Sequence, residues 1–164
     1  MVSRDITFRL ATPNDRDVIL HHRRGMFRDM GKGTKQELDA MTEATAPWLA
    51  TALADGSYRG FLAEDKNGKV VAGGGVLIAS CPARPGDLNS RRAVIINVFT
   101  EPEFRKQGLA RHLMSLIIQW LKEQGFLSVV LHASDEGQHL YESMGFVPTN
   151  EMRLWLGKPG ETQA

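Results

Sequence analysis

Apolar residues between Leu109 and Leu121 recur at intervals of three and four positions, and this spacing predicts an amphipathic helix. The residues that form the apolar stripe are Leu109, Leu113, Leu116, Ile117, Trp120 and Leu121. Two apolar runs flank it, AVIINVFT before the helix and LSVVLHA after it, and both are typical of buried strands. The strand–helix–strand order from Ala93 to Ala133 predicts a right-handed parallel crossover.

Two further helices are predicted in the first half of the chain. The first begins at Thr12-Pro13, after the strand-like run ITFRL, and continues to the glycines of GKG. The second begins near Thr34, because Glu37 lies three residues later and can complete a capping box. We expect it to reach Ala54, with a break near Pro47.

The remaining segments predict the rest of a sheet. FLAED and KVVAGGGVLIAS read as two strands joined by a hairpin at Asn67-Gly68, and the three glycines 73–75 predict a bulge or a close backbone approach. Near the C-terminus, EGQHLYESM predicts a short helix, a strand starts at Phe146-Val147, and MRLWL forms a last strand. We therefore expect one α/β domain over residues 1–157, followed by a polar tail over residues 158–164.

The start of the helix at Leu109 is unusual. The preceding turn, RKQG, is rich in cations and contains Gly108 where a Ser, Thr or Asp cap is common. A helix N-terminus exposes N–H groups and carries about half a positive charge, so Arg105, Lys106 and Arg111 would complete a site for an anion. The glycine would let that anion contact the backbone. Neither G-x-x-x-x-G-K-S/T nor G-x-G-x-x-G after a strand occurs in the sequence.

Composition limits the class of anion. The chain has 164 residues and a formal net charge of +1, so it lacks the basic field that drives nonspecific nucleic-acid binding. It contains no signal-like apolar core and no apolar run of membrane-spanning length. Cys81 is the only cysteine, which excludes an internal disulfide, and no His/Cys spacing suggests a metal. We expect a cytoplasmic protein with a small phosphate-bearing ligand and with no nucleic-acid, membrane or metal partner.

Two motifs resemble those of the GNAT superfamily of acyl-CoA-dependent N-acetyltransferases. RKQGLA, Arg105 to Ala110, matches the family's Q/R-x-x-G-x-G/A loop, and it follows a buried strand that ends near Pro102. LYESMGF, Leu140 to Phe146, matches the second signature, L-Y-x-x-x-G-F. The resemblance covers the second half of the chain, and the order of elements in the first half is compatible with it. It implies a mixed, mostly antiparallel sheet with a central parallel crossover and flanking helices.

The resemblance also implies acetyl-CoA as a co-substrate. Backbone N–H groups of the loop would hold the pyrophosphate, and the strand before the loop would pair with the pantetheine arm. The residues to which it assigns cofactor binding are Val98, Phe99, Thr100, Arg105, Lys106, Gln107, Gly108, Leu109, Ala110, Arg111, Ser134 and Tyr141.

The chemistry expected from the resemblance is direct attack of an amine on the thioester. The N–H of Val98 would bind the oxyanion, and Tyr141 would protonate the leaving thiolate. The general base is less clear, because the position where family members often have a glutamate holds Val94. Glu101 and a chain of water molecules are the two alternatives. In the helix that carries Tyr141, the family's frequent Asn and Ala are replaced by Ser134 and Gly137.

The acceptor is not specified by these motifs. Met26, Phe27, Met30 and Trp48 could line an apolar acceptor pocket, although such residues at helical spacing more often belong to a core. The leading hypothesis is an N-acetyltransferase for a small-molecule primary amine, and the resemblance also allows a homodimer. The alternatives are acetylation of protein N-termini or lysines, and a non-catalytic sensor of acyl-CoA. The basic cluster HHRRGMFR could attract an acceptor that bears a carboxylate, although a basic helix face is usually solvated.

Overall fold

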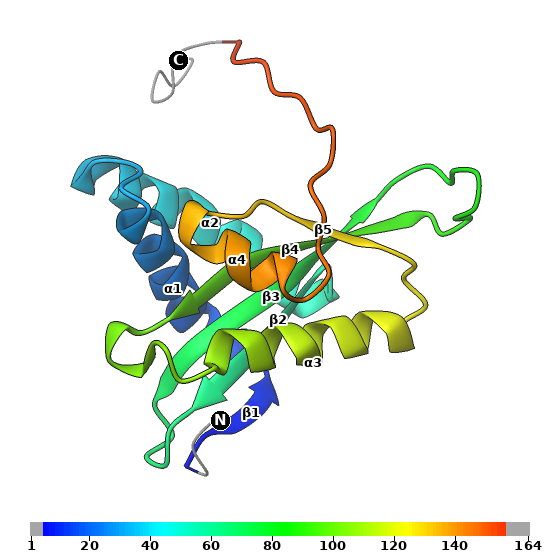
Figure 1. Cartoon of the computed structure of the whole chain (residues 1–164). Coiled ribbons are helices and arrows are strands. Elements are labelled where there is room, and N and C mark those ends of the chain that lie inside the picture. Colours follow the sequence, from blue (N-terminus) through cyan, green and yellow to red (C-terminus); the bar gives the residue numbers. More distant parts are fainter. Residues whose placement is uncertain (1–4, 157–164) are drawn as a thin grey trace. The chain divides into compact units, whose positions relative to one another are not determined.

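The structure, a computed structural model, describes residues 5–156. It contains a five-stranded sheet with the order β1-β2-β3-β4-β5 (Figure 1). The described residues fall into two compact units, 5–132 and 133–156. The first contains β1 (Thr7–Leu10), η1 (Pro13–Asp15), α1 (Arg16–Asp29), α2 (Lys35–Asp55), β2 (Tyr58–Glu64), β3 (Val70–Ser80), β4 (Arg91–Thr100), η2 (Pro102–Phe104), α3 (Leu109–Glu123) and β5 (Val129–Leu131). The second contains α4 (Asp135–Glu142). The predicted polar tail, residues 158–164, lies outside the described residues.

The sheet is mixed, as predicted. Strands β1 to β4 pair in antiparallel fashion, and β5 pairs in parallel with β4 after the crossover through α3. The hairpin between β2 and β3 turns at Asn67-Gly68, where Gly68 has a φ of 77°. This confirms the α/β fold class and the parallel strand–helix–strand unit.

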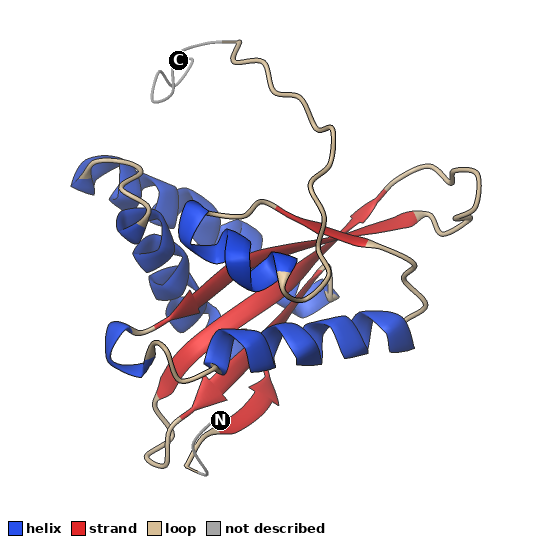
Figure 2. Ribbon diagram, viewed as in Figure 1, coloured by secondary structure: helices blue, strands red, loops and turns tan. Residues whose placement is uncertain are grey.

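Helices cover both faces of the sheet, as Figure 2 shows. A Cβ atom on Gly73 would lie 3.0 Å from Nδ1 of His22 in α1, whereas one on Gly74 would lie 3.3 Å from Cδ1 of Ile117 in α3. Because successive side chains of a strand point to opposite faces, α1 and α3 pack on opposite faces of β3. Glycines at these positions let both helices approach the backbone closely.

The second helix differs from its prediction at one point. The Thr34–Glu37 capping box is present, with the Thr34 N–H donating to Glu37 at 2.6 Å and the Glu37 N–H donating to Thr34 at 3.3 Å. The predicted break at Pro47 is wrong, because α2 continues to Asp55 with Pro47 inside it. Proline removes one backbone hydrogen bond, but the buried residues Leu49 and Ala52 anchor the next turn to the core.

The two strands predicted after α4 are also wrong, since no strand follows β5 within residues 5–156. A Schellman-type turn follows α4 instead: the Phe146 N–H donates to the Tyr141 carbonyl at 3.1 Å, and Gly145 adopts a φ of 93°. The later apolar residues are exposed, with Met152 at 94% and Leu154 at 81%. They lack the burial on which the strand prediction depended. None of the described helices has the length and apolar character needed to span a bilayer.

Candidate active site

Strand β4 has a strand partner along only part of one edge. On the β3 side, pairing extends from Arg91 to Thr100, whereas on the other side β5 pairs only with Ala93–Ile95. Within the described residues, the second half of β4 therefore has an edge that no strand covers (Figure 1). Such an edge presents backbone donors and acceptors that can bind an extended ligand as if it were an additional strand.

Hydrogen bonding identifies which residues face this open edge. The Glu101 N–H donates to the Val71 carbonyl of β3 at 2.9 Å. Because peptide groups alternate between the two edges of a strand, Phe99 also bonds toward β3, while Val98 and Thr100 point toward the open edge. The backbone of Val98 and Thr100 is therefore placed for pairing with a ligand, and the backbone of Phe99 is used within the sheet.

A β-bulge lies immediately before Val98. The pairing register shifts between Gly73 and Gly75, so that Asn97 and Val98 stand opposite the single residue Gly74. Asn97 has a φ of 60°, a left-handed conformation that asparagine tolerates better than most residues. The three glycines predicted a bulge or a close backbone approach: the extra residue of the bulge lies in β4, opposite Gly74, and the glycines themselves are the sites of close approach. Bulges bend a strand and are frequent beside active sites.

Polar side chains from α1 and β2 fix the bulge. The Arg23 Nη1 donates to Asn97 Oδ1 at 2.8 Å, and the Asn97 Nδ2 donates to Tyr58 Oη at 3.3 Å. Burial raises the pKa of Tyr58 to about 12, so its phenol is neutral and can accept this bond. A Cβ atom on Gly75 would lie 2.2 Å from Tyr58 Oη, so only glycine leaves room for the hydroxyl.

The turn after β4 forms an open helix N-terminus. Lys106 and Gly108 both adopt left-handed conformations, with φ of 60° and 80°, and the first helical bond runs from the His112 N–H to the Gly108 carbonyl. The N–H groups of Leu109 and Ala110 have no acceptor inside α3. Leu109 is buried and anchors the turn, whereas the side chains of 105–108 are exposed. The turn thus leaves the first N–H groups of α3 without intrahelical acceptors, which is the arrangement that an anion site at a helix N-terminus needs.

Arg105 differs from Lys106, the other cation of the turn, because it forms an ion pair. Its guanidinium pairs with Asp29 of α1, donates to the Thr100 carbonyl at 3.0 Å and lies 5.6 Å from the centre of the Phe99 ring. Desolvation opposes ionisation of Asp29, but hydrogen bonds from Arg105 and Arg28 lower its pKa. Asp29 thus partly compensates the charge of Arg105, while the exposed Lys106 forms no ion pair within residues 5–156.

Glu101 lies just past β4 beside two histidines of α1. Its Oε1 is 2.7 Å from His21 Nε2 and 3.8 Å from His22 Nε2. Burial lowers the pKa of His22 to about 4, against the attraction of Glu101, so His22 is neutral near pH 7. Glu101 is three residues from Val98, a separation of roughly 10 Å along an extended chain. Val94 packs in β4 opposite Val130 and supplies no acid or base.

Of the four residues predicted to line the acceptor pocket, Phe27 and Trp48 contact side chains that bond to Asn97 in the bulge. The Arg23 guanidinium lies 5.0 Å from the Phe27 ring, and Trp48 packs against Tyr58 with ring centres 6.2 Å apart. Arg23 and Tyr58 are the residues that hold Asn97. Met26 lies in α1 and Met30 is the residue that caps its C-terminus; both are half-buried.

Ser134 and Tyr141 belong to the second unit, where α4 positions both. Ser134 caps the helix, with its Oγ accepting the Gly137 N–H at 3.2 Å. Burial raises the pKa of the Tyr141 phenol, and its ring packs 5.9 Å from that of Phe146. A Cβ atom on Gly137 would lie 2.9 Å from the Tyr141 ring, so the alanine that is frequent in the family would require this ring to shift.

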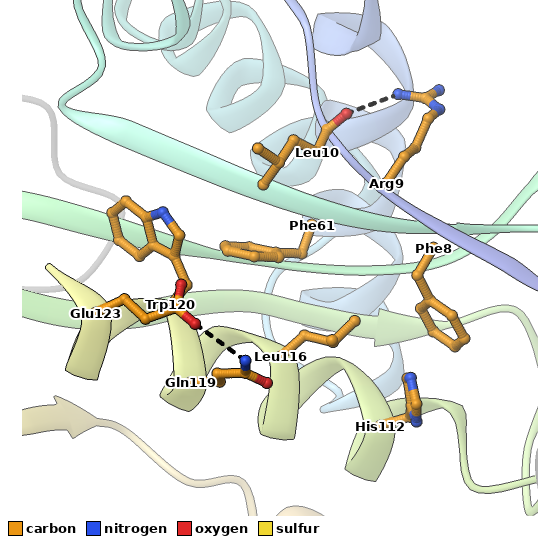
Figure 3. A pocket seen from close by; sticks show the side chains of 9 residues that line it. All are labelled: Phe8, Arg9, Leu10, Phe61, His112, Leu116, Gln119, Trp120 and Glu123. Carbon is orange, nitrogen blue, oxygen red and sulfur yellow. Dashed lines mark hydrogen bonds between the residues drawn. The ribbon is translucent and has the colours of Figure 1, made fainter.

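A separate pocket of about 400 Å³ lies between β1, β2 and α3 (Figure 3). Phe8 stacks on His112 with ring centres 4.2 Å apart, and Phe61 meets Trp120 at 6.0 Å. Its lining includes none of the predicted site residues. In the described part of the chain, no cluster of three or more His, Cys, Asp or Glu side chains could hold a metal ion.

Arg23, Asn97 and Tyr58 are the neighbours of the site that sequence reasoning missed. A signal for one of them was present, since Asn97 is the only polar residue between Ala93 and Phe99. Arg23 and Tyr58 lie 74 and 39 positions from Asn97 in the sequence. No local sequence pattern could therefore predict that they contact it.

The chain is similar in sequence and in fold to acetyltransferases. Residues 19–146 match the model of the Acetyltransferase (GNAT) family. Human N-acetyltransferase 8 is 28% identical over 78 residues, which cover 46% of this chain and 34% of the human protein. The chain thus spans about a third of that relative's length.

Solved structures extend the similarity over nearly the whole chain. A GCN5-related N-acetyltransferase from Ralstonia eutropha JMP134 superposes with a TM-score of 0.86 at 34% identity, covering 92% of this chain and 98% of that one. A predicted acetyltransferase with acetyl-CoA from Clostridium acetobutylicum has a TM-score of 0.80 at 23% identity, covering 94% and 96%. The chain therefore belongs to the GNAT family of acetyltransferases.

Proposed function

We propose that this acetyltransferase transfers the acetyl group of acetyl-CoA to the primary amine of a small molecule, by direct attack within a ternary complex. One observation carries the proposal: the uncovered edge of β4 continues directly into the open N-terminus of α3. Coenzyme A has an extended pantetheine arm followed by a diphosphate, and these two adjoining groups of backbone donors can bind them in that order. The C. acetobutylicum relative, described with acetyl-CoA, supports the same ligand.

The backbone of the first unit would bind acetyl-CoA at two places. Val98 and the N–H of Thr100 would pair with the amide groups of the pantetheine arm, since both residues face the open edge and the Thr100 carbonyl already accepts a bond from Arg105. The N–H groups of Leu109 and Ala110 would donate to the pyrophosphate, with the exposed Lys106 adding charge. Arg105 would mainly stabilise the conformation of the turn, because its ion pair with Asp29 connects the turn to α1.

The reaction needs an amine, an oxyanion site and an acid. The amine nitrogen attacks the thioester carbonyl carbon, the new C–N bond forms, and the C–S bond then breaks to release a thiolate. The Val98 N–H would bind the oxyanion of the intermediate, a contribution of about 3 kcal/mol in related acyl-transfer reactions. Tyr141 would protonate the thiolate, as its place in the LYESMGF motif implies. Its pKa, raised by burial, keeps the phenol protonated at neutral pH.

Acetyl-CoA should bind without an acceptor and raise the melting temperature of the chain. Replacing Gly108 with valine should abolish this shift, because Gly108 has a φ of 80° and a branched side chain there would occupy the place of the phosphate. Differential scanning fluorimetry at millimolar acetyl-CoA measures both proteins. An unchanged melting temperature for the wild-type chain would contradict the proposed function. Retained binding by Gly108→Val would show that the turn is not the phosphate site.

Tyr141→Phe should lower kcat by about one to four orders of magnitude while leaving the affinity for acetyl-CoA nearly intact, because only the proton donor is removed. Steady-state kinetics with one good acceptor, together with acetyl-CoA titrations, separate the two quantities. The substitution keeps the ring that packs against Phe146 and Gly137. If the variant instead lost folding stability with no separate loss of kcat, Tyr141 would be a packing residue.

The amine should lose its proton to water and not to a dedicated carboxylate, since Glu101 is roughly 10 Å from Val98 along the chain and is bonded to His21. We therefore expect log(kcat/KM) to rise with pH toward the pKa of the acceptor amine, near 10.4 for an alkylamine. Glu101→Gln should change the profile little between pH 6 and 10. A loss of about a hundredfold confined to the variant, with removal of the acidic limb, would instead identify Glu101 as the base.

A further inference from the structure

We infer that the acceptor amine carries a carboxylate and that Arg23 binds it. The inference rests on the proposed function and adds to it the chemical class of the acceptor. The Arg23 guanidinium forms no ion pair in the described part of the protein. It bonds to Asn97, the residue that precedes Val98, the proposed oxyanion donor.

Arg23 differs from the other arginines of its helix. Helix α1 contains Arg16, Arg23, Arg24 and Arg28, and three of them pair with aspartates: Arg16 with Asp17, Arg24 with Asp39 and Arg28 with Asp29. Arg23 has no carboxylate partner in residues 5–156, although it is more buried than the exposed Arg28. A cation withdrawn from water without a counter-ion is unfavourable, and burial lowers the pKa of the Arg23 guanidinium.

The hydrogen-bonding capacity of Arg23 is mostly unused. A guanidinium offers five N–H donors, and the described residues supply one acceptor, the Oδ1 of Asn97 at 2.8 Å. Its Nε is buried and bonds to no protein atom in the described chain. Since Arg23 can only donate, Asn97 must turn its oxygen toward Arg23 and its NH₂ toward Tyr58, so the amide cannot flip to compensate. A planar carboxylate, which accepts two parallel N–H bonds, suits this fork.

The position of Arg23 links this charge to the reaction. Asn97 immediately precedes Val98, whose N–H faces the open edge, so an acceptor held by Arg23 would lie next to the thioester carbonyl. Phe27 lies against Arg23, and Trp48, 40% exposed, lies against Tyr58. These two aromatic rings would contact the apolar part of the acceptor. An amino acid, or a similar compound with an amine and a carboxylate a few bonds apart, fits all three features.

The test compares acceptors in matched pairs: phenylalanine with phenethylamine, leucine with isoamylamine, and γ-aminobutyrate with propylamine. Acetyl-CoA-dependent thiol release is measured for each. For the best pair, kcat/KM should favour the carboxylate-bearing member by about ten- to a hundredfold, the effect of a hydrogen-bonded charge pair. Arg23→Gln should reduce this ratio toward one, and Arg23→Lys should restore only part of it, because lysine lacks the fork.

Arg24→Gln is the matched control. Arg24 is the next residue of α1, and its charge is compensated by Asp39 at 2.7 Å, so the preference for the carboxylate should persist in this variant. The acetyl-CoA-induced rise in melting temperature, measured on Arg23→Gln, shows whether that variant is folded. If it is not, Arg23→Lys provides the comparison of ratios.

Three results would overturn the inference. The first is equal or better use of the amines without a carboxylate, and the second is a preference that Arg23→Gln and Arg23→Lys both leave unchanged. The third is that the wild-type chain acetylates no carboxylate-bearing acceptor, although acetyl-CoA still raises its melting temperature. In that case the acetyl-CoA site of the proposed function stands and the acceptor class is wrong. Failure of acetyl-CoA itself to bind would reject the proposed function, and the inference with it.

Discussion

The bulge at Asn97 is the constraint on which the site depends. A regular strand would continue its register against β3 without interruption, whereas β4 inserts one residue opposite Gly74 and then resumes pairing at Phe99. A left-handed residue in the middle of a sheet is unfavourable unless its surroundings hold it there. Arg23 and Tyr58 hold Asn97 through its amide, and Gly75 leaves the space that the Tyr58 hydroxyl needs. The bulge lies where the pairing of β4 with β5 has ended, so the backbone just after it faces an open edge.

Helix α1 organises both ends of this edge. At the bulge it supplies Arg23, and at its C-terminus it supplies Asp29, which holds Arg105 of the turn before α3. Between them, Gly25 lets the helix pack directly on Phe99, because a Cβ atom there would lie 2.8 Å from the ring. The same helix that would recognise the acceptor thus also positions the turn that would bind the diphosphate.

Local patterns in the sequence predicted the features that local interactions determine. The spacing of apolar residues identified α3, and the cation-rich RKQG turn identified its open N-terminus, because helix periodicity and turn conformation depend on neighbouring residues. The capping box at Thr34 was predicted for the same reason. The strands expected after α4 were not found, because alternation of apolar residues does not report whether a partner edge exists. The polar group around Asn97 depends on long-range contacts, and so only the structure shows that Arg23 has no carboxylate partner among the described residues.

We propose that acetyl-CoA binds to backbone groups on the open edge of β4 and at the N-terminus of α3. Amide hydrogen exchange followed by NMR tests it most directly, residue by residue. Adding acetyl-CoA should slow exchange at Val98, Thr100, Leu109 and Ala110, because a ligand would then accept or cover their N–H groups. The amide of Phe99, already bonded within the sheet, should change much less. Binding of acetyl-CoA with no added protection at Val98 and Thr100 would contradict the account.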